Sequence, residues 1–141
     1  MRNLILSCFF FVLILSSMIS GCGNDQSIKY QRYFADGSQL YKVHCESCHM
    51  NDGSGLAALI PPLSDSTFLI QNRKKLACFV VYGLNDSIQI KGKIYQNLMP
   101  AEKHLAPIDL AKVLTYITNS FGNQQGIYDV KEVERNLQHC N

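Results

Sequence analysis

The chain has 141 residues, with 13 basic and 11 acidic side chains and a net charge of +2. Because 47% of its residues are hydrophobic, it can bury one core, which excludes wholesale disorder; its length excludes a large multidomain enzyme. The small net charge argues against a nucleic-acid partner, which would require a concentrated basic surface.

Residues 1–21 have the pattern of a secretory signal. Arg2 precedes an apolar run from Leu4 to Ile19, and small residues follow. The ending Ile19-Ser20-Gly21-Cys22 resembles the bacterial lipobox, in which the cysteine is lipidated and becomes the first residue after cleavage. An uncleaved membrane anchor is the alternative, although the run is slightly short for a membrane span. Both interpretations predict an exported domain; the lipobox predicts a lipid on Cys22 that holds it at a membrane of the bacterial envelope, facing the periplasm.

Residues 22–35 show no clear period and are predicted to be a tether, which leaves one domain over residues 36–141. The remaining elements follow from apolar spacing, from turn residues and from capping residues. They are a short helix over 37–48, a helix over 67–82 with Arg73, Lys74 and Lys75 outward, a hairpin over 87–96 that turns at Lys91-Gly92, a helix from Pro107 to a stop at Gly122, and a last helix capped by Asp129 and Glu132.

The strongest motif is Cys45-Glu46-Ser47-Cys48-His49, a C-x-x-C-H sequence of the kind that attaches haem c. Two thiols three residues apart on one helical turn reach the two vinyl groups of a haem. His49 then directs its imidazole at the iron as the proximal ligand. A thioredoxin-like redox pair would need a βαβ pattern around the motif, and a zinc site would need a second ligand pair. The sequence shows neither, so we expect one covalent haem.

A six-coordinate haem iron needs a second axial ligand, and Met99 is the candidate. Its thioether is a soft ligand that raises the reduction potential, and Pro100 biases Met99 away from helix. Met50 is adjacent to the attachment site and badly placed for the opposite face of the haem. His44 and His104 are the rival ligands; His104 is expected on a charged surface turn.

The C-x-x-C-H motif with the downstream Met99-Pro100 resembles the class I monohaem cytochrome c family, in its small bacterial lipoprotein form, over about residues 36–122. The hairpin expected before the Met99 loop and the extra C-terminal helix come from the residue pattern, whereas the resemblance implies an all-α cytochrome c fold with about three to five helices around one haem. It also implies that Gly37 lets two helices cross closely. A carbonyl of Pro61 or Pro62 would accept a hydrogen bond from His49. Tyr95 would pack on the haem edge.

Two cysteines have no role in this scheme, Cys78 and Cys140. Because an exported domain lies in an oxidising compartment, we expect them to form a disulfide that joins the C-terminal helix to the helix over 67–82. Two unrelated thiols are the alternative.

The resulting hypothesis is a lipid-anchored carrier of single electrons, with a redox protein as donor, another as acceptor, and no small-molecule substrate. The alternatives are a haem enzyme or gas sensor with a displaceable Met99, and a fixed cytochrome subunit of a membrane oxidoreductase complex. Six basic residues form either a positive rim that steers an acidic redox partner or only a solvated face: Arg73, Lys74, Lys75, Lys91, Lys93 and Lys103.

Overall fold

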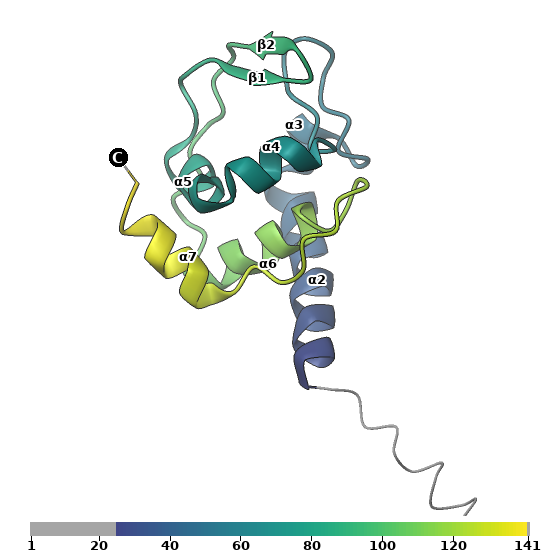
Figure 1. Cartoon of the computed structure of the whole chain (residues 1–141), viewed down its shortest axis with the longest axis vertical. Helices are drawn as coiled ribbons and strands as arrows, with labels where there is room; N and C mark the ends of the chain where they lie inside the picture. Colours follow the sequence, from purple (N-terminus) through teal and green to yellow (C-terminus); the bar gives the residue numbers. More distant parts are fainter. Residues whose placement is uncertain (1–24, 141) are drawn as a thin grey trace, which may run out of the picture.

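The structure, a computed structural model, describes residues 25–140 as short helices around one core, with a small two-stranded hairpin at one end (Figure 1). This arrangement confirms the predicted fold class, including the hairpin and the extra C-terminal helix. The elements are α2 (Asp25–His44), α3 (Glu46–His49), α4 (Ser66–Gln71), α5 (Arg73–Tyr82), β1 (Ile88–Ile90), β2 (Lys93–Tyr95), α6 (Pro107–Ile117) and α7 (Val130–Leu137).

The N-terminal helix is longer than the sequence pattern predicted. Residues 25–35 are the first half of α2, so the prediction of a tether is wrong from Asp25 on; Cys22 and the signal lie outside the described residues. The cause is an aromatic stripe at helical spacing. Tyr33 is buried, and the ring of Phe34 lies 5.2 Å from that of Tyr116 in α6. Burial of this stripe against α6 holds the helix in place.

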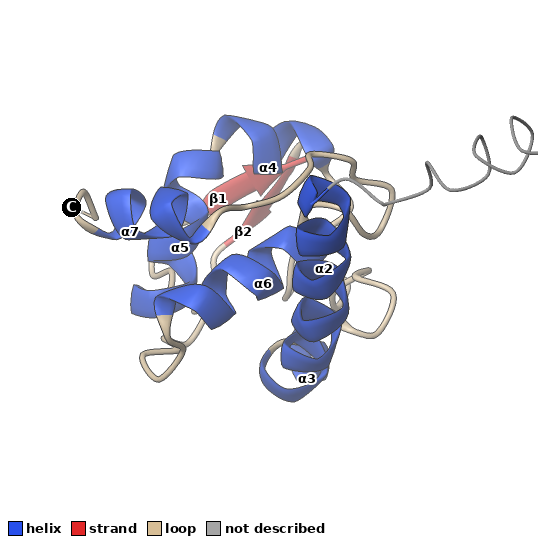
Figure 2. Ribbon diagram, turned by 90° about the horizontal axis from the view of Figure 1, so that it is seen from below, coloured by secondary structure: helices blue, strands red, loops and turns tan. Residues whose placement is uncertain are grey.

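Helix α2 crosses α6 closely, and this contact organises the core (Figure 2). A Cβ atom added at Gly37 would lie 2.1 Å from the carbonyl oxygen of Lys112, so only glycine fits at the crossing. The expectation for Gly37 is therefore confirmed. On the other side of α6, Leu110 and Val113 are completely buried. The helix begins with Pro107 at its first position, as expected.

The helix predicted over 67–82 is instead two helices, α4 and α5. Asp65 caps α4 by accepting a hydrogen bond from the backbone N–H of Phe68. The chain bends at Asn72, whose side-chain amide donates to the carbonyl of Phe68 at 2.9 Å. This local bond competes with the helical ladder, which explains why the apolar pattern continues while the helix does not.

The hairpin lies where it was predicted. Strands β1 and β2 are antiparallel, with Ile88 opposite Tyr95 and Ile90 opposite Lys93. Tyr95 and Ile90 are buried, whereas Ile94 is exposed. One face of the hairpin therefore turns toward the interior, as alternation requires.

In the C-terminal part, the end of α6 differs from the prediction, whereas the start of α7 agrees with it. Helix α6 ends at Ile117 instead of Gly122, because the side chain of Asn119 accepts from the backbone N–H groups of Gln125 and Gly126 and organises a loop. Helix α7 begins after Asp129, which accepts from the N–H of Lys131. Within residues 25–140, none of the helices combines the length and the apolar character that a membrane span requires.

Candidate functional site: an apolar cavity with a C-x-x-C-H helix

One cavity is lined by most of the residues that the sequence analysis identified as site residues. It lies among α3, α4, α5, the hairpin and α6. Among its lining residues, the only side chains with nitrogen or oxygen atoms are His49, Asp65, Tyr95 and Asn97. The structure brings seven predicted site residues to this cavity: Cys45, Cys48, His49, Pro61, Pro62, Tyr95 and Met99.

The attachment motif is a single tight turn that follows α2 directly. The N–H of Cys45 donates to the carbonyl of Tyr41, and the N–H of His49 donates to the carbonyl of Cys45 at 2.9 Å. Cys45 and Cys48 are free thiols, so the motif is not a disulfide here. Burial, with smaller contributions from the carboxylate of Glu102 and from Cys48, raises the pKa of Cys45 to about 12. Before a thioether forms, the Cys45 thiol is therefore neutral at neutral pH.

The two nitrogen atoms of the His49 imidazole have different roles: Nδ1 makes a hydrogen bond, and Nε2 is available as a ligand atom. Its Nδ1 lies 3.2 Å from the carbonyl oxygen of Pro61. A carbonyl can only accept, so this bond puts the proton on Nδ1 and leaves the Nε2 lone pair available to a metal. Burial lowers the pKa of His49, an effect that the bond to Pro61 partly offsets. The ring is thus held neutral, which is the form that ligates iron. Of the two prolines left open above, Pro61 is the acceptor.

Met99 is held in an extended segment by the end of α5. Its N–H donates to the carbonyl of Leu84 at 2.9 Å, and the N–H of Leu84 donates back at 3.0 Å. Three residues on, the N–H of Glu102 donates to the carbonyl of Val80. The backbone of the Met99 segment is therefore fixed against the C-terminal end of α5, while the thioether lines the cavity.

The rival histidines do not line the cavity. His104 is exposed, and the Nδ1 of His44 faces the carboxylate of Glu102 at 3.3 Å. Among the histidines in residues 25–140, only His49 belongs to the lining.

Two residues at the site escaped the sequence analysis. The side-chain amide of Asn97 donates to the carbonyl of Leu59 at 2.9 Å and so joins the Met99 segment to the loop that carries Pro61. The carboxylate of Glu102 contacts His44 and helps to raise the pKa of Cys45. Neither has a sequence signal, because each acts through a contact made far along the chain.

The predicted positive rim needs a correction. Arg73 does not point outward; its guanidinium makes paired bonds to the carboxylate of Glu132 at 2.7 and 2.9 Å. Its charge is therefore neutralised within the fold. Lys74, Lys75, Lys91, Lys93 and Lys103 are exposed. Leu59 and Leu98, at 53% and 71% exposure, line the cavity and still reach solvent, so the mouth is mainly apolar.

The donor set fits a covalently attached haem. Two thiols lie on one turn, an imidazole nitrogen and a thioether sulfur line the same cavity, and the rest of the lining is apolar enough to cover a porphyrin. Elsewhere in residues 25–140, side chains of His, Cys, Asp and Glu form no group of three that would hold a metal ion. The residues that line the cavity therefore suit a haem iron.

Comparison with known proteins agrees with this chemistry. The family described as cytochrome c matches residues 34–121. Cytochrome c-552 of Thermus thermophilus is 30% identical over 101 residues, which cover 69% of this chain and 76% of that protein.

Similarity extends to parts of larger proteins. The cytochrome c subunit of the quinone-dependent alcohol dehydrogenase of Gluconobacter oxydans (strain 621H) is 31% identical over 91 residues, or 62% of this chain and 18% of that subunit. The fructose dehydrogenase cytochrome subunit of Gluconobacter japonicus is 29% identical over 108 residues, or 71% of this chain and 21% of that subunit.

Proposed function

Since this chain belongs to the cytochrome c family, whose members bind haem c covalently and carry electrons, we propose that it is a lipid-anchored monohaem carrier of single electrons in the bacterial cell envelope. In this proposal Cys45 and Cys48 hold the haem through thioethers, and His49 and Met99 are the axial ligands. The bound haem supplies the Fe(III)/Fe(II) couple. The observation that carries the proposal is the meeting of both thiols, the imidazole and the thioether in one apolar cavity.

The protein residues have separate tasks. The carbonyl of Pro61 accepts a hydrogen bond from the Nδ1–H of His49, which orients the ring and strengthens it as a ligand. Leu84 holds the backbone of Met99, so that the thioether faces the cavity. The apolar lining keeps water away and favours the less charged reduced state. None of these tasks requires a substrate pocket or a proton transfer. They are sufficient for a protein that only carries electrons.

Haem attachment and one-electron chemistry are tested together on the matured protein. Haem should remain on the polypeptide in a denaturing gel, and potentiometric titration should follow a one-electron curve. Replacement of both thiols by serine should abolish the retained haem while the polypeptide is still made. Full haem retention in the serine variant would overturn the attachment proposed here.

The lipid anchor is supported by the sequence of residues 19–22. Radiolabelled fatty acid should be incorporated into the wild-type protein and lost in Cys22→Ser. The Cys22→Ser protein should also leave the detergent phase in a phase-partition experiment. Equal labelling of both proteins would refute the anchor.

A second candidate function is a fixed cytochrome subunit of a dehydrogenase complex, in which the same haem would serve one permanent partner. It is favoured by the similarity to two dehydrogenase cytochrome subunits, although the chain spans only about a fifth of their length. Mild detergent extraction separates the two functions. A fixed subunit should copurify in constant ratio with a larger oxidoreductase, whereas a free carrier should elute alone.

A further inference from the structure

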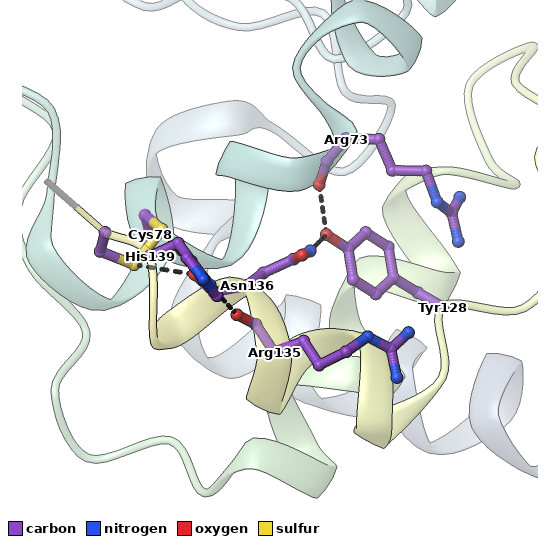
Figure 3. The surroundings of a disulfide bond; sticks show 7 residues. Arg73, Cys78, Tyr128, Arg135, Asn136 and His139 are labelled. Carbon is purple, nitrogen blue, oxygen red and sulfur yellow. Dashed lines mark hydrogen bonds between the residues drawn. A yellow bond between two sulfur atoms is a disulfide. The ribbon is translucent and has the colours of Figure 1, made fainter.

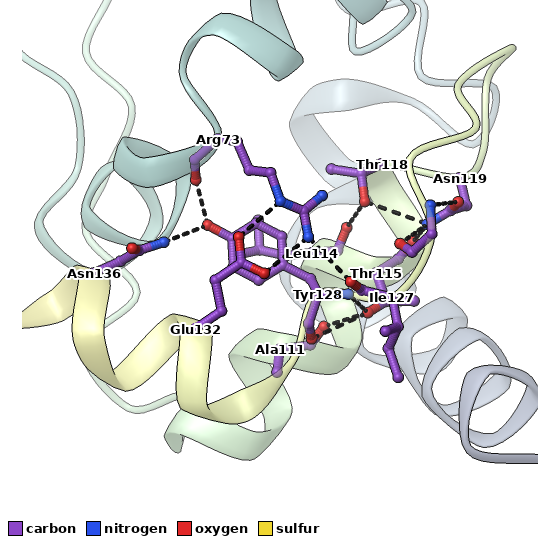
Figure 4. Close-up of polar contacts among 11 residues, drawn as sticks. Arg73, Ala111, Leu114, Thr115, Thr118, Asn119, Ile127, Tyr128, Glu132 and Asn136 are labelled. Atoms are coloured by element: carbon purple, nitrogen blue, oxygen red, sulfur yellow. Dashed lines mark hydrogen bonds and ion pairs between the residues drawn. The ribbon is translucent and has the colours of Figure 1, made fainter. Parts of the chain in front are cut away.

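The C-terminal segment, residues 127–140, lies beyond the region matched by the cytochrome c family and closes on helix α5. We call this segment the C-terminal clamp. Its first contact is with Arg73, the first residue of α5. The Arg73 guanidinium bonds both carboxylate oxygens of Glu132 and also donates to the carbonyl of Ile127 at 3.0 Å (Figure 4). The clamp thus fixes the N-terminal end of α5.

Tyr128 strengthens the same contact. Its side chain is completely buried, its hydroxyl donates to the carbonyl of Arg73, and its ring lies 4.4 Å below the guanidinium. Asn136 in α7 donates to the Tyr128 hydroxyl at 2.8 Å. Because these groups satisfy one another within the fold, α5 and α7 meet through a connected polar network and through apolar packing.

The second contact is covalent. Cys78, in the middle of α5, forms a disulfide with Cys140, which follows α7 (Figure 3). The two Cα atoms are 5.5 Å apart, and 62 positions separate the residues in sequence. Together with the Arg73 contact, the disulfide restrains α5 at two points. A helix of ten residues is about 15 Å long, so restraint at two points sets its position along its whole length.

The C-terminal end of α5 and the two residues that follow it hold the Met99 segment. Leu84 exchanges two backbone hydrogen bonds with Met99, and Val80 accepts from Glu102. At Gly83 an added Cβ would lie 2.4 Å from the carbonyl oxygen of Met99, so the two backbones are in direct contact. A displacement of α5 would therefore be passed directly to Met99.

We propose that the C-terminal clamp positions Met99: by fixing α5, the Cys78–Cys140 disulfide and the Arg73–Glu132 pair keep the Met99 segment closed on the cavity. The proposal rests on Met99 being the axial ligand, as in the proposed function. It makes Cys78, Cys140 and Glu132 positioning residues. A disulfide that only reduces the entropy of the unfolded chain would not change how often the Met99 segment opens in the folded protein, whereas a positioning device would.

Competition by imidazole for the ferric iron of the matured protein measures that opening. The variant is the serine pair Cys78→Ser/Cys140→Ser. Its matched control is Lys29→Gln, which removes the ion pair between α2 and Asp129 but leaves every contact to α5. We expect the serine pair to bind imidazole at least about fivefold more tightly than wild type, and its sulfur-to-iron absorption band to weaken, with the control unchanged.

Unchanged imidazole affinity in the serine pair, with only a lower denaturation midpoint, would overturn the proposal, since the disulfide would then act on the unfolded chain alone. If the serine pair does not accumulate, Glu132→Gln, with the disulfide intact, should also bind imidazole more tightly; wild-type affinity in that variant would be equally decisive against the clamp. A wild-type spectrum without a sulfur-to-iron band would overturn both the clamp and Met99 ligation, which distinguishes it from failure of the clamp alone.

Discussion

Met99 lines the same cavity as His49, and its backbone is fixed by Leu84. Replacement by histidine should give an iron with two nitrogen ligands. Because a thioether favours Fe(II) more than an imidazole does, the reduction potential should fall by on the order of 0.1 V or more, within the roughly 0.8 V range that axial ligands cover. Spectroelectrochemistry of the two proteins measures the change.

Met50 provides the matched control for this substitution. It follows the attachment motif, is partly buried and is not among the residues that line the cavity. Met50→Leu should keep the wild-type potential and the sulfur-to-iron band. If Met50→Leu lost that band while Met99→His retained it, the ligand assignment would have to be exchanged.

Asp129 gives a residue-scale prediction about pH. The ammonium group of Lys29 and the backbone N–H of Lys131 lower the pKa of this carboxyl below its ordinary value of 3.8. A lowered pKa means that the contribution to folding is complete above that ordinary value and is lost as the pH falls through the folded-state pKa. Because the pair is partly exposed, Asp129→Asn should destabilise the protein by less than about 1 kcal/mol at pH 7.

Urea unfolding of both proteins over a range of pH checks this sign. The difference in unfolding free energy should shrink as the solution is acidified below 3.8. Asparagine still accepts a hydrogen bond at the start of α7, so the cap is kept and only the charge is removed. A difference that grew in acid would contradict the assigned direction.

At the scale of elements, the crossing of α2 and α6 depends on Gly37. Alanine is intrinsically better than glycine in a helix by about 1 kcal/mol. Even so, Gly37→Ala should destabilise the matured protein by about 1–3 kcal/mol, since the new Cβ would lie 2.1 Å from the Lys112 carbonyl oxygen. Chemical denaturation measures the loss.

Ser38→Ala is the control for the crossing, because it changes the next residue of α2. Its effect should remain within about 0.5 kcal/mol. Equal stability of Gly37→Ala and wild type would mean that the two helices separate at little cost, and the close crossing would lose its role in the core.

The elements also show what could be predicted from the sequence. The hairpin and the start of α6 were predictable because local signals, alternation with Lys91-Gly92 and Pro107 at the first position, agree with the fold. The first half of α2 was not predicted because its stripe, which includes Tyr33 and Phe34, has meaning only against α6. The break at Asn72 depends on a side-chain bond that competes with the helix.

The same distinction applies to the site. Cys45, Cys48, His49 and Met99 were identified from their chemistry and spacing, and the fold gathers them in one cavity. The choice of Pro61 over Pro62, the bond from Asn97 to Leu59 and the neutralisation of Arg73 by Glu132 could not be predicted, because each depends on residues brought together by the tertiary structure.

At the scale of the whole molecule, the described part of the chain has two segments outside the region that matches the cytochrome c family, and we call these segments the additions. The part matched by the cytochrome c family, residues 34–121, contains both proposed ligands, and it is bracketed by the first turns of α2 and by the C-terminal clamp. Lys29 and Asp129 connect these two additions to each other. The additions therefore lie outside the lining of the cavity, whose mouth at Leu59 and Leu98 is apolar and exposed.

The central claim is that His49 and Met99 both ligate the iron, so that the protein only carries electrons. An optical spectrum of the matured protein tests it most directly, taken ferric, then reduced, then reduced with carbon monoxide. We expect a c-type spectrum with a far-red sulfur-to-iron band in the ferric form and no change on addition of carbon monoxide. Rapid carbon monoxide binding by the reduced protein would exclude stable Met99 ligation and would indicate a haem enzyme or gas sensor with an open sixth position.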